Sequence, residues 1–62
     1  MERELVIKVE CKGVDDDSAS VLIYRLGDRV SLVATAERGG DAEVVLDKTT
    51  ALALAEALRK VS

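Results

Sequence analysis

The sequence has no proline, histidine, tryptophan or phenylalanine, and it has one cysteine, Cys11, and one tyrosine, Tyr24. A single thiol excludes a disulfide within the chain, and without histidine or a second thiol there is no ligand set for a structural zinc ion. The lack of histidine also removes the Ser-His-Asp and Cys-His arrangements of nucleophilic catalysis. We therefore expect no enzyme activity, no cofactor, no metal and a purely aliphatic core.

The chain also has no excess of positive charge and no long apolar run. Nine Lys and Arg residues against twelve Asp and Glu residues give a net charge of −3, which is not the basic footprint of a nucleic-acid-binding domain. The apolar runs are far shorter than the roughly 20 residues that span a bilayer, and the first four residues, Met-Glu-Arg-Glu, lack the features of a signal peptide. We expect a cytoplasmic protein with no membrane partner, a compartment in which one free thiol is normal.

The length of 62 residues allows one domain, residues 1–62, with a small core. A chain of this size buries about 60% of the surface that it exposes when unfolded, so small domains usually add a disulfide, a metal or a partner chain. Because the first two are excluded, either association with a second chain or unusually good packing must supply the remaining stability.

The centre of the sequence is predicted to be a β-hairpin. Two β-prone runs flank Gly27-Asp28, a two-residue turn signal. With these residues as the loop, the register runs from Leu26 opposite Arg29 to Val21 opposite Ala34. The two faces of the hairpin then carry Val21, Ile23, Val30, Leu32 and Ala34 on one side and Leu22, Tyr24, Leu26 and Val33 on the other. Both faces are apolar, whereas a sheet with one solvated face alternates apolar and polar residues.

A further strand is predicted on each side of this hairpin. Glu4–Cys11 alternates between apolar and charged residues, apart from Val6, which is apolar on the charged side. The strand Asp41–Leu46 follows either a two-residue loop, Gly39-Gly40, or a three-residue loop, Arg38–Gly40. The longer loop is preferred because it sets like side chains opposite one another. Its pairs are Ala36 with Ala42, Ala34 with Val44 and Leu32 with Leu46.

The end of the chain is predicted to be a helix. Ala51–Lys60 is rich in alanine and leucine, the best helix formers. Asp47 can cap the amino terminus of the helix by accepting a hydrogen bond from the amide of Thr49 or Thr50. An apolar stripe recurs at helical spacing, and it consists of Ala51, Leu54, Ala55, Leu58 and Val61.

The expected fold is α+β: a four-stranded antiparallel β-meander followed by one C-terminal helix packed on one sheet face (ββββα). The helix is expected to cover the face with Leu5, Ile7, Val9, Val21, Ile23, Val30, Leu32, Ala34, Val44 and Leu46. The opposite face leaves six apolar residues, Val6, Leu22, Tyr24, Leu26, Val33 and Val45. In an unbroken register Val6 lies opposite Tyr24, and the six residues form one patch. Because such patches usually mark interaction surfaces, we predict a homodimer through this face.

Three polar features have both structural and functional interpretations. Asp15–Asp17 lacks the ligand spacing of a calcium loop and fits a solvated turn. Cys11 falls on the face under the helix and fits a small buried hydrophobe better than a reactive thiol. Arg25, Arg29 and Arg38 provide the alternative function, a small nucleic-acid-associated regulator, although one tyrosine is few for a reader of single strands.

The last third of the chain follows a Gly-Gly turn and runs from Val44-Val45-Leu46-Asp47 through Ala51 to Leu54-Ala55 and Ala57-Leu58. It resembles the ending of small uncharacterised strand-then-helix proteins of actinobacteria and their phages. The resemblance implies a cytoplasmic accessory protein and carries no activity and no functional residues. With the apolar patch, it predicts a small non-enzymatic protein–protein interaction module, a homodimer that modulates a larger protein.

Overall fold

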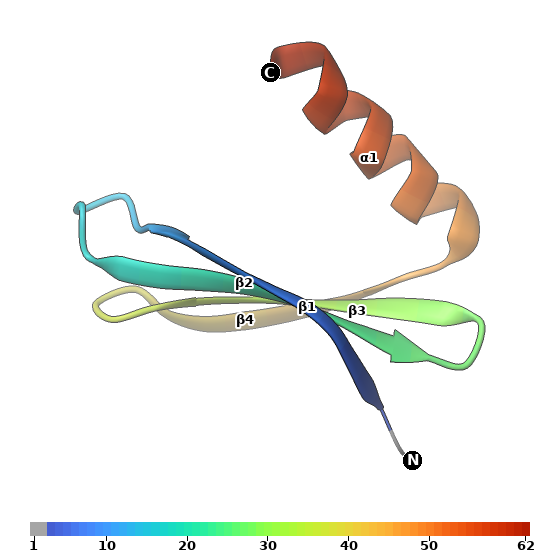
Figure 1. The fold of residues 1–62 in the computed structure, drawn as a ribbon, viewed down its shortest axis with the longest axis horizontal. Helices are drawn as coiled ribbons and strands as arrows, with labels where there is room; N and C mark the ends of the chain where they lie inside the picture. Colours follow the sequence, from blue (N-terminus) through green and yellow to red (C-terminus); the bar gives the residue numbers. More distant parts are fainter. Residues whose placement is uncertain (1–2) are drawn as a thin grey trace.

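The structure is a computed structural model that describes residues 3–62; Met1 and Glu2, which begin the charged amino terminus noted above, lie outside the described residues. Four antiparallel strands form one open sheet in the order β1-β2-β3-β4, and one helix follows them (Figure 1). The elements are β1 (Glu4–Lys12), β2 (Ser18–Leu26), β3 (Arg29–Ala36), β4 (Gly40–Leu46) and α1 (Lys48–Val61). The predicted α+β class and ββββα order are confirmed.

The β2–β3 hairpin has the predicted register. Leu26 lies opposite Arg29, Ile23 opposite Leu32, and the pairing continues in step along both strands. Gly27 has a φ of 60°, a left-handed conformation that glycine adopts without steric cost in a two-residue loop. The turn signal in the sequence therefore located both the loop and the two faces of the ribbon.

The pairing of β1 with β2 differs from the prediction. A β-bulge falls at Val6, which has no partner on β2, so that Leu5 lies opposite Tyr24. The predictions that Val6 faces Tyr24 and that Leu5 lies on the helix side are therefore wrong. The bulge sets Glu4 opposite Arg25, where Oε1 and Nη1 are 3.3 Å apart; an unbroken register would have put an apolar side chain beside this guanidinium.

The β3–β4 loop has three residues, as predicted, but it lies one position earlier in the chain. The loop is 37–39, and Gly40 starts β4 opposite Ala36 with a φ of 79°. The amide of Glu37 donates to the carbonyl of Ser18 on β2 at 3.0 Å, which keeps it from pairing with β4. The observed pairs are Ala34 with Ala42, Leu32 with Val44 and Val30 with Leu46. The predicted partners were thus two residues off, a shift that leaves every side chain on its predicted face.

The helix stands away from the sheet. From the end of β4, α1 rises on one side of the sheet and diverges from it (Figure 1). Ala51, in the first turn, is half-buried, and no residue of the helix is buried. The Cα radius of gyration is 12.4 Å, against about 10.6 Å for a compact domain of this length. The expected covering of one sheet face by the helix is therefore not found within a single chain.

Candidate interaction surfaces

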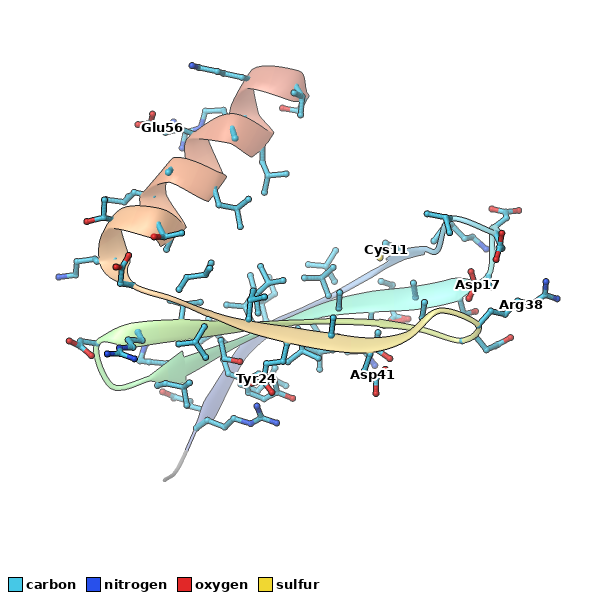
Figure 2. All side chains as sticks on the ribbon, turned by 180° about the vertical axis from the view of Figure 1, so that it is seen from behind. Cys11, Asp17, Tyr24, Arg38, Asp41 and Glu56 are labelled. Atoms are coloured by element: carbon cyan, nitrogen blue, oxygen red, sulfur yellow. The ribbon has the colours of Figure 1, made fainter. Side chains whose placement is uncertain are left out.

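The sheet face on the helix side, here called the inner face, is apolar along most of its length. Figure 2 shows Cys11 on this side of the sheet and Tyr24 on the other. The strand registers assign to the inner face Ile7, Val9, Cys11, Ala19, Val21, Ile23, Val30, Leu32, Ala34, Ala36, Ala42, Val44 and Leu46. Ile7 and Val44 expose 50% and 51% of their surface, because no element of the described chain lies over them.

The helix presents a second uncovered apolar surface, the helix stripe, which consists of Ala51, Leu54, Ala55, Leu58 and Val61. Leu54 and Leu58 expose 38% and 59% of their surface. Glu56 lies on the side of α1 that faces away from the sheet (Figure 2). Residues two positions away from it on either side lie across the helix, so these two leucines face the gap between α1 and the sheet.

The described chain has no apolar core. Within residues 3–62 no hydrophobic side chain is buried, and the one buried residue is Ser31. The accessible surface is 5080 Å², whereas a folded monomer of 6.6 kDa exposes about 3,900 Å², an excess of about 1,200 Å². Because burial of apolar surface is the main driving force of folding, the inner face and the helix stripe are surfaces that still have to be covered.

The half of the inner face far from the helix forms a shallow hollow of ≈ 400 Å³. Its lining includes the small side chains Cys11, Ala19, Ala34, Ala36 and Ala42. The larger side chains of Ile23, Val30 and Leu32 lie nearer the end of the sheet where α1 begins. Small residues allow a neighbouring element to approach the backbone closely, so the hollow is the part of this face best suited to bulky side chains from outside.

The other side of the sheet, here called the outer face, carries a polar network that sequence reasoning missed. The guanidinium of Arg3 lies 4.2 Å from the centroid of the Tyr24 ring, and its Nη1 is 2.7 Å from Oε2 of Glu43. The hydroxyl of Ser31, which is fully buried, donates to the same carboxylate oxygen. No local pattern predicts this network, because Arg3 and Glu43 are 40 positions apart and meet only through the sheet order.

The six residues predicted as the interface are Val6, Leu22, Tyr24, Leu26, Val33 and Val45. Apart from the bulged Val6, the strand registers place them on the outer face, where Leu22 pairs with Val33 and Val45 with Ser31. Leu5 joins them there through the bulge. Val6 and Val45 each expose 51% of their surface, and the other four predicted residues are half-buried. Because the polar network crosses this face, it is less apolar than the inner face, and its interface role stays a prediction.

The thiol of Cys11 is free and exposed in the single chain. The prediction of a small buried hydrophobe at this position is therefore not met by the chain alone. Cys11 lies on the inner face, as predicted. It is exposed for the same reason as Ile7, because no element of the described chain lies over it.

The acidic run Asp15–Asp17 belongs to the β1–β2 loop, and one of its carboxylates joins two loops. The amide of Arg38 donates to Oδ2 of Asp17 at 2.8 Å, and the amide of Gly13 donates to the Asp17 carbonyl at 2.9 Å. A Cβ atom on Gly13 would lie 2.2 Å from Oδ1 of this aspartate, so any side chain there would displace the carboxylate that joins the two loops. Among the described residues, no group of three or more His, Cys, Asp or Glu side chains is placed to hold a metal ion.

The three arginines of the alternative function do not form one patch. Arg25 and Arg29 flank the β2–β3 turn near the start of α1 and line a hollow there together with Lys48. Arg38 lies in the β3–β4 loop, at the opposite end of the sheet (Figure 2). Arg25 is also paired with Glu4, so the placement of these side chains does not favour a nucleic-acid surface.

The start of the helix is capped as predicted. Asp47 has extended backbone angles, and its Oδ1 accepts a hydrogen bond from the amide of Thr50 at 2.8 Å. This backbone hydrogen bond, followed by the Thr50 side chain and the charge of Arg29, holds the pKa of Asp47 below its ordinary value. Because one residue separates β4 from α1, the cap also sets the direction in which the helix leaves the sheet.

We expect Asp47→Ala to lower the helical circular dichroism signal at neutral pH, while Asp47→Asn retains the cap. Since the folded-state pKa of Asp47 is depressed, its contribution to stability is present above the unfolded-state pKa and is lost as the pH falls through the folded-state pKa. The wild type should therefore lose more helix below about pH 4 than Asp47→Asn does. Equal helical signals for Asp47→Ala and the wild type at every pH would show that the cap is dispensable.

No protein-family model, no curated protein and no solved structure matches this chain. The resemblance of the last third to actinobacterial and phage proteins accordingly stays a prediction. Among the described residues, no helix is both long and apolar enough to cross a membrane. The features of the described chain that bear on its function are therefore the inner face, the helix stripe and the polar network of the outer face.

Proposed function

We propose that the protein is a non-enzymatic protein–protein interaction module that folds as a homodimer and acts in the cytoplasm as an accessory or modulator of a larger protein. The observation that carries the proposal is the lack of any buried apolar side chain within residues 3–62. A chain in this state has most of its folding free energy still to gain, and it gains that free energy by covering the inner face and the helix stripe.

A second copy of the chain is the partner that the surface area supports. If each chain buries its excess of about 1,200 Å², a dimer buries about 2,400 Å² in total, which is in the range of obligate homodimers. The inner face is more apolar than the outer face and carries no polar network, so we assign self-association to the inner face. This assignment differs from the sequence-based prediction of a dimer through Leu22, Tyr24 and Val33.

The outer face then remains available for the larger protein. It combines the half-buried Leu22, Leu26 and Val33 with the Arg3–Tyr24 stack and exposed charges such as Lys8 and Glu10. A mixed surface of this kind is typical of non-obligate interfaces. In this proposal, the dimer provides stability and its two outer faces provide recognition.

Sedimentation equilibrium together with far-ultraviolet circular dichroism tests the proposal. We expect a folded species of about 13 kDa, twice the mass of the 6.6 kDa chain, at concentrations near 50 µM or above, since obligate dimers have no stable folded monomer. A folded species that sediments at the mass of one chain at all concentrations would contradict the proposal. Retention of random-sequence DNA that weakens steeply with salt would instead favour the nucleic-acid alternative.

A further inference from the structure

We infer that the homodimer is a reciprocal one, in which the helix stripe of each copy packs into the hollow on the inner face of the other. The inference rests on the proposed function and names the occupant of its main surface. In this arrangement the leucines of one helix stripe lie over the small residues around Cys11 of the second copy. The dimer then has two identical cores, and each core consists of the sheet of one chain and the helix of the other.

Helix α1 does not reach the hollow of its own chain. The helix begins after Leu46, at the end of β4 opposite to Gly40, and the hollow lies at the Gly40 end. From its base α1 diverges from the sheet (Figure 1). With only Asp47 between β4 and α1 and that residue engaged in the cap, there is little chain in which a hinge could form. The hollow must therefore be filled from outside.

The two uncovered surfaces, the hollow and the helix stripe, match each other. The helix stripe projects two leucines, and the lining of the hollow includes four alanines and Cys11 besides the larger Val14 and Val21, so large side chains of the helix meet mainly small ones, as close packing requires. A helix of 14 residues is about 21 Å long, shorter than a nine-residue strand of about 30 Å. One helix is therefore shorter than the inner face is long and can lie over the hollow.

The uncovered surfaces also suit a symmetric pair of chains. A two-fold axis presents the same surfaces of both copies to each other, so one contact covers both inner faces and both helix stripes at once. An unrelated partner would have to supply a sheet for the helix stripe and a helix for the hollow. The second copy already carries both, and together they account for the excess surface of each chain.

The centre of this contact carries almost no charge. The inner face is apolar apart from Glu4 and Arg25 at one end, and these two side chains are paired with each other. Glu56 lies across α1 from the helix stripe (Figure 2), and Lys60, four positions on, lies on the same side, whereas Lys48 and Arg59 lie at the borders of the stripe. Covering the inner face with a helix stripe therefore leaves these charges at the rim of the contact, in reach of water, and places no charge at its centre, where an unpaired ion would oppose the contact strongly.

Disulfide trapping with the native thiol of Cys11 tests the inference. Under mild oxidation, Leu54→Cys or Leu58→Cys should give a covalent dimer on a non-reducing gel, with mass-spectrometric mapping of the bridge from Cys11 to the introduced thiol. The matched control is Glu56→Cys, on the opposite side of α1, which should form this bridge at least about tenfold more slowly because its thiol faces solvent. A bridge of the same pair within one chain would show that the helix closes on its own sheet, and would overturn the inference.

A second variant separates this inference from the proposed function. Leu22→Cys in a Cys11→Ser background places the one thiol on the outer face. If sedimentation gives a dimer and this variant bridges while the helix variants do not, the dimer forms through the outer face, so the inference fails and the proposed function stands. A monomeric folded chain overturns both.

The alkylation rate of Cys11 in the unaltered chain tests the same packing without any substitution, so it can be measured even if the cysteine variants fail to fold. The native thiol should react at least about tenfold more slowly at a concentration where the dimer forms than after dilution, because the partner's helix lies over it. A rate that is fast and independent of concentration would contradict the packing of a helix over this thiol.

Discussion

Leu32→Asp should leave the chain unfolded and monomeric, whereas Leu22→Asp should leave it folded and associated. Both leucines are half-buried on central strands, but Leu32 lies on the inner face between Ile23 and Val44, and Leu22 lies on the outer face. In the proposed dimer Leu32 is fully buried, so a carboxylate there loses its hydration without a partner. The loss of about 4 kcal/mol or more is as large as the total of about 3–5 kcal/mol that a small core usually provides.

Leu22→Asp is the matched control for this experiment. Its position lies opposite Lys8 on β1, so an introduced carboxylate gains a cross-strand partner and stays in contact with water. We expect a loss of about 1 kcal/mol or less. Circular dichroism and sedimentation of the two variants provide the measurement. If Leu22→Asp dissociates the dimer and Leu32→Asp remains a stable dimer, the interface lies on the outer face and the assignment to the inner face is wrong.

Dilution should destabilise the protein. When a folded dimer unfolds to two chains, each tenfold dilution lowers the free energy of unfolding by about 1.4 kcal/mol. For a denaturant slope of about 1.3 kcal/mol per molar urea, this shifts the urea midpoint down by about 1 M for every tenfold dilution. Urea titrations followed by circular dichroism at about 1, 10 and 100 µM measure the shift. Superimposable curves at these concentrations would contradict a dimer that is coupled to folding.

Two copies joined by a flexible Gly-Ser linker provide the control for this dilution series. Covalent connection replaces the concentration of free chains with a fixed effective concentration. The unfolding midpoint of the fused protein should therefore be independent of concentration and should lie above that of the unlinked chain at low micromolar concentrations. A midpoint that still moves with dilution would point to an assembly larger than the dimer.

The elements predicted correctly from the sequence are those whose signals are local. The two-residue loop at Gly27-Asp28 fixes the β2–β3 register without reference to the rest of the chain. The helix and its cap at Asp47 follow from propensity and from one side-chain-to-amide hydrogen bond. Even the misplaced β3–β4 loop kept each side chain on its predicted face, since the error was an even number of residues.

The features that were missed depend on two or more strands at once. The bulge at Val6 has no local signal, because Leu5, Val6 and Ile7 are all apolar and either register keeps them in the sheet. In the observed register Glu4 lies opposite Arg25 on β2 and pairs with it, a contact that depends on both strands. The network of Arg3 and Glu43 likewise requires the order of all four strands, so the composition of the outer face was judged more apolar than it is.

By itself the sequence determined that the chain is small and aliphatic, that it forms a four-stranded meander and a capped helix, and that one helix is too little to cover a ribbon apolar on both sides. Only the tertiary structure decided which side is left open. The short connection at Asp47 directs α1 away from the sheet, and the outer face is partly closed by its own arginine, tyrosine and glutamate. Register and helix direction depend on contacts between distant segments, and these contacts leave the inner face and the helix stripe as the surfaces with the most free energy to gain from a partner.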